Sequence, residues 1–254
     1  MKTLILSMSP RRSFSASMYY SKLLKLGIKN HEVELLELKT PRQYSVVEKQ
    51  LSEVDNIVFV TPVYVDTIPS TVLDKLVKIE NYVQDKDIKL NIYALTNCGF
   101  YEGEQCDLAQ KTFKIWSKRC GFEFKGGLGI GAGVMLAFIR TLIPIGIIIT
   151  LFEFLFFAIY ALITTGTITF NDVIHTPMTL IVQTALYFLW STGLFINLFK
   201  MAKKIEKQSK MGIVYTTLWF CPRFLFVIIA SIYWIIASIF WYRGNFLKLL
   251  KEPE

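Results

Sequence analysis

Residues 4–17 read Leu4-Ile-Leu-Ser-Met-Ser-Pro-Arg-Arg-Ser-Phe-Ser-Ala-Ser17, an apolar run that gives way to serines and arginines. The apolar part belongs to Lys2–Met8, which has the length and composition of a buried β-strand. Beyond the polar loop, Ser15–Ile28 places its apolar residues at helical spacing. The chain therefore begins with a strand, a loop rich in hydroxyls and cations, and a helix.

The alternation of strand and helix continues to about residue 130. The expected elements are further strands over Glu32–Leu38, Asn56–Val60, Ile88–Thr96 and Phe122–Gly127, and helices over Pro69–Val83 and Glu104–Cys120. Such an alternation predicts an α/β fold in which helices cover both faces of a parallel sheet. We expect a doubly wound, five-stranded parallel sheet with the strand order 2-1-3-4-5. The glycine-rich run Gly126–Gly133 then indicates a hinge or a closely packed entry helix more than a second phosphate loop.

Charge divides the chain into two unlike halves. Residues 1–133 hold 33 of the 48 charged residues, and residues 134–254 hold 15. We expect an α/β domain over residues 1–133, a membrane region of about three helices over residues 134–242, and a C-terminal tail over residues 243–254. The net charge is +8, but the basic residues of the first half do not cluster with aromatic residues, which argues against nucleic-acid binding.

The cysteines give no sign of a metal centre. Cys98, Cys106, Cys120 and Cys221 form no CxxC pair, so neither a zinc site nor an iron–sulfur cluster is predicted. We interpret them as buried or unreactive thiols. The apolar run at the N-terminus is shorter than the 7–15 residues of a secretory signal, so the first domain is expected in the cytoplasm.

Three apolar stretches follow the α/β half. Val134–Ile163 carries only Arg140 and Glu153 as charges, whereas Pro177–Phe199 and Phe224–Tyr242 carry none. Since about 20 apolar residues span a bilayer, three crossings are expected. Lysines are absent from residues 164–176 but frequent in residues 200–210, so the positive-inside rule also predicts a cytoplasmic N-terminal domain. The predicted localisation is the cell membrane, multi-pass.

Some alternatives stay open in this region. A hairpin or interfacial helix ahead of Phe224 would return the C-terminal tail to the cytoplasm, and the helix ending at Lys207 could cover the α/β domain instead of crossing lipid. The all-round apolar character of Leu180–Phe199 favours the membrane. An ionisable residue at the depth of Glu153 could line a proton or quinone pocket, pair with Arg223, or be protonated at a helix contact.

Ligands of doubly wound sheets bind at the carboxyl ends of the strands, where the winding direction reverses. Here the loops at that point are Ser9–Ser17 and Thr61–Ile68. The first offers hydroxyls, the cations Arg11 and Arg12, and the N–H groups of a helix start, which are the parts of an anion site. The alternative is that Ser13 or Ser15 only caps the helix and that the arginines are solvated.

Three segments together resemble a known family. They are Ser9-Pro-Arg-Arg-Ser-Phe-Ser-Ala-Ser17, Thr61-Pro-Val-Tyr-Val-Asp-Thr-Ile-Pro69 and Thr96-Asn-Cys-Gly-Phe100, after the first, third and fourth strands. In this order they resemble the flavin-contacting loops of the flavodoxin-like NAD(P)H-dependent FMN reductase family, over about residues 1–131. The first loop departs from the family because it lacks the Gly or Asn often found there.

The resemblance implies a set of FMN-binding residues. The FMN phosphate would be held by Ser9, Arg11, Ser15 and Ser17 with the backbone of Ala16. The ribityl chain and isoalloxazine ring would be lined by Pro62, Val63, Tyr64 and Val65. The far side of the ring would be flanked by Asn97, Cys98, Gly99 and Phe100. NAD(P)H use is implied by the resemblance alone, because no motif marks a nicotinamide pocket.

These expectations combine into a membrane-anchored FMN-dependent oxidoreductase. It would take a hydride from NAD(P)H and pass electrons to a quinone or a membrane redox protein; no catalytic acid or base is readable. The expected partners are the lipid bilayer and, from the resemblance, a second copy of the chain in a homodimer. The alternative is a flavin-free docking module of a membrane complex, which the glycine-poor first loop favours. A transporter is disfavoured because the apolar segments show no repeat.

Overall fold

The computed structural model describes residues 1–10, 15–39, 41–65, 67–84, 86–133, 139–167, 175–228, 230–231 and 235. The chain divides into two compact units, Met1–Trp219 and Phe220–Glu254. In the second unit residues 223–228 are helical. Most of the predicted third membrane span, Phe224–Tyr242, lies outside the described residues.

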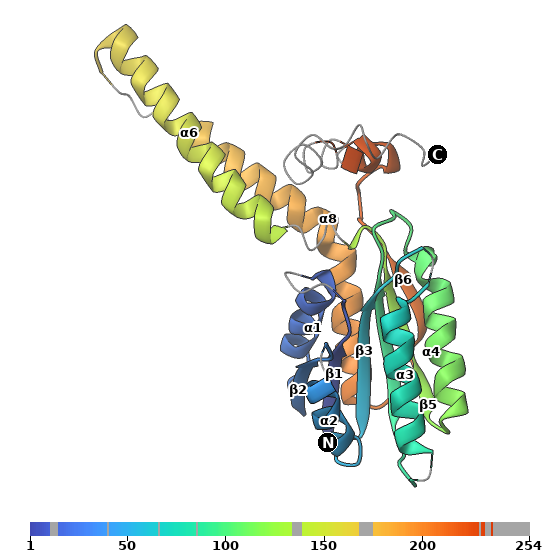
Figure 1. Cartoon of the computed structure of the whole chain (residues 1–254). Helices are drawn as coiled ribbons and strands as arrows, with labels where there is room; N and C mark the ends of the chain where they lie inside the picture. Colours follow the sequence, from blue (N-terminus) through green and yellow to red (C-terminus); the bar gives the residue numbers. More distant parts are fainter. Residues whose placement is uncertain are drawn as a thin grey trace, which may run out of the picture. The chain divides into compact units, whose positions relative to one another are not determined.

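A six-stranded parallel sheet lies at the centre of the first unit (Figure 1). Its strands are β1 (Lys2–Ser7), β2 (Glu32–Glu37), β3 (Asn56–Pro62), β4 (Asn91–Asn97), β5 (Glu123–Ile130) and β6 (Gly212–Thr216). The order is β2-β1-β3-β4-β5-β6, and every neighbouring pair is parallel. The predicted order 2-1-3-4-5 is confirmed. The predicted number of five strands is wrong, because β6 returns from beyond the apolar region and pairs with β5.

Helices cover both faces of the sheet. The helices with described bounds are α1 (Ala16–Gly27), α2 (Pro41–Gln50), α3 (Ser70–Val83), the 3-10 turn η1 (Gly103–Cys106), α4 (Asp107–Arg119), α6 (Ile139–Thr165) and α8 (His175–Glu206). One face is packed by α2, α3 and α4, whose apolar residues join those of β1 and β3 in one cluster. The other face is packed by α1 and by the second half of α8.

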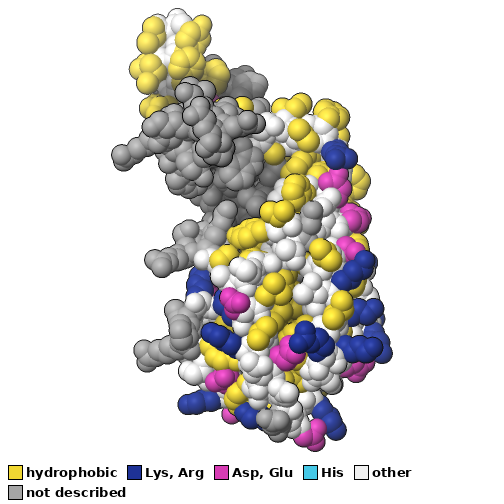
Figure 2. All heavy atoms as spheres, turned by 45° about the vertical axis from the view of Figure 1, so that its right-hand side comes forward, with side chains coloured by type: hydrophobic (Ala, Val, Ile, Leu, Met, Phe, Trp, Pro, Cys, Tyr) yellow, Lys and Arg dark blue, Asp and Glu magenta, His cyan; other side chains and the backbone are white. Residues whose placement is uncertain are grey.

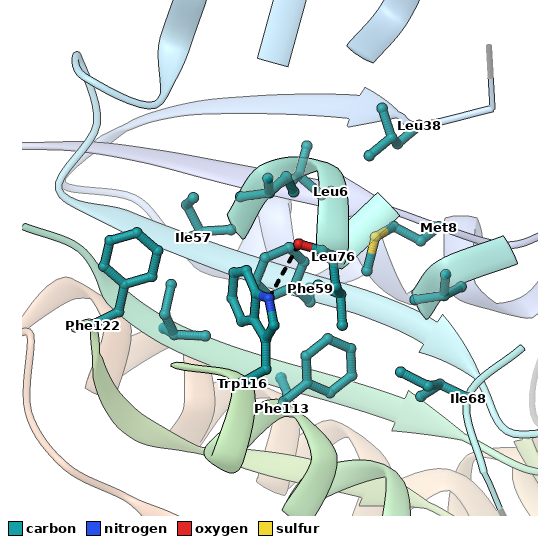
Figure 3. Close-up of a cluster of buried hydrophobic side chains, with 14 of the residues drawn as sticks. Leu6, Met8, Leu38, Ile57, Phe59, Ile68, Leu76, Phe113, Trp116 and Phe122 are labelled. Atoms are coloured by element: carbon teal, nitrogen blue, oxygen red, sulfur yellow. Dashed lines mark hydrogen bonds between the residues drawn. The ribbon is translucent and has the colours of Figure 1, made fainter. Parts of the chain in front are cut away.

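Aromatic side chains fill the first of these faces (Figure 3). The Phe59 ring of β3 stacks on Phe113 of α4 with centroids 5.3 Å apart, and Trp116 meets Phe59 edge-on at 5.3 Å. The buried Trp116 indole Nε1–H donates to the Leu76 carbonyl of α3 at 3.1 Å. Because a buried unpaired donor costs about 1–3 kcal/mol, this bond helps to fix α4 against α3.

The second half of α8 belongs to the α/β body. Its inward residues Leu194, Leu198, Met201, Ala202 and Ile205 are buried. The helix lies so close to α1 that a Cβ on Gly27 would stand 3.1 Å from the Ala202 Cβ. The suggestion that the helix ending near Lys207 covers the sheet is therefore right for this half.

The glycines of β5 allow close packing in the sheet. A Cβ on Gly127 would lie 2.0 Å from Gln110 Oε1 of α4, and one on Gly129 would lie 2.7 Å from the Tyr215 ring of β6. The strand runs to Ile130, beyond the predicted end at Gly127. The interpretation of this run as a hinge or an entry helix is therefore wrong. Most of the run is part of a strand, and its glycines let neighbouring elements approach closely.

Between β5 and β6 the chain forms a two-helix hairpin, made of α6 and the first half of α8 (Figure 1). Ala158 and Ala161 are buried in this hairpin. Small residues are common at positions where two helices approach closely. Figure 1 shows α8 changing direction between its halves. Midway along α8 the Trp219 backbone N–H donates to the Trp190 carbonyl at 3.0 Å, and a Cβ on Gly193 would stand 2.1 Å from Trp219 Nε1. A donor from outside the helix at a helix carbonyl is a known cause of bending.

The hairpin carries mostly apolar residues on its surface (Figure 2). Phe152 is 72% exposed, Phe156 65% and Ile163 78%. Among the described residues, one helical stretch, Thr184–Glu206, is long and apolar enough to cross a membrane by length and composition alone. Thr150–Thr165 is apolar but shorter. Part of the first stretch covers the sheet, so the exposed apolar surface of these helices lies mainly on the hairpin.

Candidate cofactor-binding site

The three predicted loops meet at the carboxyl edge of the sheet. In the sheet register Ser7 of β1 pairs with Val60 of β3, and Pro62 pairs with Asn97 of β4, so the three strands end side by side. Parallel pairing puts the loops that follow them at one edge. The sequence therefore predicted correctly which loops lie together.

Asn97 joins all three loops. The Ser17 hydroxyl of α1 donates to Asn97 Oδ1 at 3.0 Å, and the Val63 N–H after β3 donates to the Asn97 carbonyl at 2.8 Å. Ser17, Val63 and Asn97 are all buried. Sequence reasoning placed these residues beside the cofactor and missed that they bond to one another. Their bonds hold the start of α1 against the ends of β3 and β4.

The N-terminus of α1 faces this junction. Ser15 has extended backbone and its Oγ accepts from the Met18 N–H at 3.1 Å, which makes it the N-cap. The first N–H groups of a helix have no partner within the helix, so those of Ala16 and Ser17 are the ones a bound anion would meet. The positive end of the helix dipole adds to that attraction. Arg11 lies outside the described residues.

Two aromatic side chains stand at the outer part of the edge. Tyr64, after β3, is 40% exposed, and Phe100, after β4, is 52% exposed. Tyr64 is held by a reciprocal backbone pair with Thr67, its N–H donating at 2.8 Å. The next residue, Val65, is 88% exposed and has a φ of 50°, a left-handed conformation that a β-branched residue rarely adopts. Strain of this kind gathers at ligand-binding loops.

The predicted residues thus divide by exposure. Buried in the described structure are Ser9, Ser15, Ser17, Pro62, Val63, Asn97 and Cys98, whereas Tyr64, Val65, Gly99 and Phe100 are exposed and Ala16 is intermediate. The Cys98 side chain belongs to the apolar cluster against α3 and α4. The exposed residues can touch a ligand directly, whereas the buried residues support the loops at this edge of the sheet.

The start of the hairpin is tied to the same edge. The buried Tyr20 hydroxyl of α1 donates to the Gly133 carbonyl at 2.6 Å, where the chain leaves β5. Burial raises the pKa of Tyr20 well above its usual value, so this donor keeps its proton. The Gly133 N–H in turn donates to the Cys98 carbonyl at 2.8 Å. The chain that enters the hairpin therefore passes directly beside the candidate site.

A separate hollow of about 390 Å³ lies near the other end of the strands. It is lined by Asp55, Lys89, Leu90, Asn91, Gly121, Glu123 and Gln208. Asp55, Asn91 and Glu123 stand just before or at the beginning of β3, β4 and β5, at the amino ends of the strands. Because ligands of doubly wound sheets bind at the carboxyl ends, this hollow is the weaker candidate.

No protein-family model and no curated protein matches the chain. Solved structures similar to it include the Trp repressor binding protein from Bacillus subtilis, with 13% identity and a TM-score of 0.42 over 50% of this chain and 85% of that one. An NADPH-quinone reductase from P. pentosaceus has 15% identity and a TM-score of 0.40 over 52% and 86%. An NAD(P)H:quinone oxidoreductase from Methanothermobacter marburgensis has 14% identity and a TM-score of 0.40 over 55% and 92%. The strand order, rather than these likenesses, identifies the N-terminal half as flavodoxin-like.

Proposed function

We propose that the chain is an FMN-dependent oxidoreductase held at a membrane by the α6–α8 hairpin, with NAD(P)H as donor and a bilayer quinone as acceptor. The observation that carries the proposal is that the three flavin-type loops and the two ends of an apolar hairpin share one edge of the sheet. Gly133 begins the path to α6, and Tyr187 of α8 stands beside Tyr19 of α1. A cofactor at this edge would lie close to the lipid surface.

The residues of the edge fit FMN. The N–H groups of Ala16 and Ser17 at the start of α1 would receive the phosphate, and Arg11 would add its charge. Tyr64 and Phe100 would bound the flat ring, since both are exposed aromatics on neighbouring loops. The junction at Asn97 would keep the two ends of the site at a fixed spacing. When bound, FMN supplies hydride and single-electron chemistry that amino-acid side chains lack.

The topology limits how the hairpin enters a bilayer. The chain leaves from β5 and returns to β6, and these two strands are neighbours in one sheet. The hairpin must therefore cross a membrane twice or not at all. The part of α8 before Tyr187, residues 175–186, is about 18 Å long at about 1.5 Å per residue, against a hydrocarbon core of about 30 Å. This length favours a hairpin that dips into the bilayer from the side of the α/β unit.

FMN titration of the purified full chain tests the cofactor. We expect tight binding with a flavin absorption band, and a Kd raised about tenfold or more by Arg11→Ala, because a hydrogen bond to a charged group is worth about 1.5–3 kcal/mol. The matched control is Arg119→Ala, whose arginine is 66% exposed in an ion pair with Glu80 and should leave the Kd unchanged. Equal affinity of wild type and Arg11→Ala would remove the phosphate assignment.

A second candidate is a flavin-free docking module. It is favoured because the side chains of two predicted phosphate ligands already have other partners. Ser15 caps α1, and Ser17 donates to Asn97. A chain that stays colourless and takes up no FMN at high concentration would support this candidate and reject the oxidoreductase.

A further inference from the structure

Two thiols lie together beneath the loop that follows β4. Cys98 comes directly after the strand, and Cys106 is the last residue of η1, eight positions along the chain. Their side chains lie close enough to interact electrostatically, and both belong to the same buried cluster. They also share a neighbour, because the Ile130 carbonyl accepts from the Cys98 N–H at 2.9 Å and from Cys106 Sγ at 3.9 Å. No CxxC motif links the two cysteines, and the fold brings them together.

The pair is buried among backbone carbonyls of the neighbouring segments. Cys98 is 1% exposed and Cys106 0%. The Cys98 thiol is within reach of the Phe100 carbonyl at 3.7 Å and the Glu102 carbonyl at 3.6 Å. Among the described residues no group of three or more His, Cys, Asp or Glu is placed to hold a metal ion. Two thiols in contact without a third ligand are suited to disulfide chemistry.

The two sulfurs are not equivalent. The interaction with Cys106 lowers the pKa of Cys98, because it stabilises the Cys98 thiolate. The same interaction and burial raise the pKa of Cys106. Cys98 also directly precedes the exposed Gly99, so it is the sulfur placed to attack as a thiolate, and Cys106 is the one placed to resolve.

We propose that Cys98 and Cys106 are a redox-active dithiol, which a peroxide converts into an intramolecular disulfide. The Cys98 thiolate attacks one peroxide oxygen and the O–O bond breaks, giving a sulfenic acid at Cys98; the departing oxygen takes up a proton as water or alcohol. The Cys106 sulfur then attacks the Cys98 sulfur, the S–O bond breaks, and water leaves with the Cys106 proton. Two thiols lose two electrons to the peroxide, and a small thiol can return the pair to its reduced form by exchange.

The disulfide would tie the Asn97–Phe100 segment to η1. Gly99 and Phe100, which directly follow Cys98, are exposed, so a small oxidant in solvent meets the segment that carries the Cys98 thiol. The proposal does not rest on FMN, since the chemistry needs only the two sulfurs and a peroxide. Where FMN binds, however, the oxidised pair would fix one wall of its site.

Mass spectrometry of the full chain tests the pair. After treatment with hydrogen peroxide and alkylation of the remaining thiols, we expect two fewer alkylated cysteines and a peptide in which Cys98 is joined to Cys106. A Cys120→Ser, Cys221→Ser variant is the matched control and should form the same disulfide. Cys106→Ser should stop at the Cys98 sulfenic acid, which dimedone captures, whereas Cys98→Ser should leave Cys106 unmodified.

Two outcomes would overturn the proposal. The first is a wild-type chain, or the control variant, that keeps Cys98 and Cys106 alkylatable while peroxide oxidises other residues. The second is capture of a sulfenic acid at Cys106 in Cys98→Ser as fast as at Cys98 in Cys106→Ser, which would reject the assigned roles. The wild type and the control variant keep the test valid even where a serine variant fails to fold.

Discussion

Asn97, one of the predicted flavin contacts, also holds neighbouring loops together. Its side chain accepts from Ser17 and its carbonyl from Val63, so it bonds to two loops from the end of a third strand. The sequence could place Asn97 at this edge, because residues after a parallel strand gather there. It could not show the partners, because the side chains of Asn97 and Ser17 meet across 80 positions of the chain.

Asn97→Ala should weaken both the fold and the site. The variant leaves the buried Ser17 hydroxyl without its acceptor, which costs about 1–3 kcal/mol in the free energy of unfolding. It also frees the start of α1, so the Kd for FMN should rise several-fold. Urea unfolding and FMN titration measure the two effects.

Thr112→Ala is the control for Asn97→Ala. The Thr112 hydroxyl donates to the Leu108 carbonyl on the exposed face of α4, so its loss should change the free energy of unfolding by less than about 0.5 kcal/mol. An Asn97→Ala variant as stable as this control would show that the junction does not hold the loops.

At the scale of elements, α8 is one helix with two environments. Its second half is buried on the sheet beside α1, and its first half pairs with α6 in the hairpin. Composition averages these halves, and for that reason Leu180–Phe199 resembled a complete membrane span. A sheet-covering face can be as apolar as a lipid-facing one. The bend between its halves separates the two environments.

Gly193→Ala should disturb this bend. Its Cβ would stand 2.1 Å from Trp219 Nε1, and overpacking of this kind costs about 1–3 kcal/mol. We expect a lower melting temperature and a changed tryptophan emission spectrum as Trp219 moves. Thr192→Ala, at the adjacent position, should change neither; the same spectrum in Gly193→Ala and wild type would contradict the packing described.

Glu206 fixes the end of α8 in a pH-dependent way. Its Oε1 accepts from the Lys29 N–H at 2.6 Å and the Asn30 N–H at 3.0 Å, and these bonds lower its pKa. A lowered folded pKa stabilises the fold above the unfolded pKa of about 4.3, and this contribution is lost as the pH falls through the folded value. The stability advantage of wild type over Glu206→Gln should therefore be constant near neutrality and shrink below about pH 4.3. Chemical unfolding across pH measures it, and a difference that grows in acid would contradict the assignment.

Two elements escaped prediction for different reasons. Helix α2 is polar, and Val47 is its buried apolar residue among those described, so its helical stripe was too weak to detect. The gap between β2 and β3 still required it, because parallel strands need a crossover of a dozen or more residues. Strand β6 was hidden because Gly212–Thr216 stands beside an apolar run and was counted with the membrane region.

At the scale of the whole molecule, the hairpin is an insertion between two neighbouring strands of one sheet. Charge patterning revealed where the apolar region starts, but not that the chain returns to the sheet after it. That return depends on pairing between Gly126–Ile130 and Gly212–Thr216, residues more than 80 positions apart. The chain that enters the hairpin lies beside the candidate site, and this proximity is the reason why we propose a bilayer acceptor.

Quinone reduction in vesicles tests this arrangement most directly. The assay compares NAD(P)H oxidation by the FMN-loaded full chain with a long-chain quinone dissolved in the vesicles and with a water-soluble short-chain quinone. The matched variant carries Phe152→Asn, Phe156→Asn and Ile163→Asn on the exposed hairpin, which removes about 1.5–3 kcal/mol of apolar burial per residue in lipid. We expect wild type to reduce both quinones and the variant to reduce only the soluble one. Failure of wild type to reduce the vesicle quinone, or equal rates in the variant, would contradict the account.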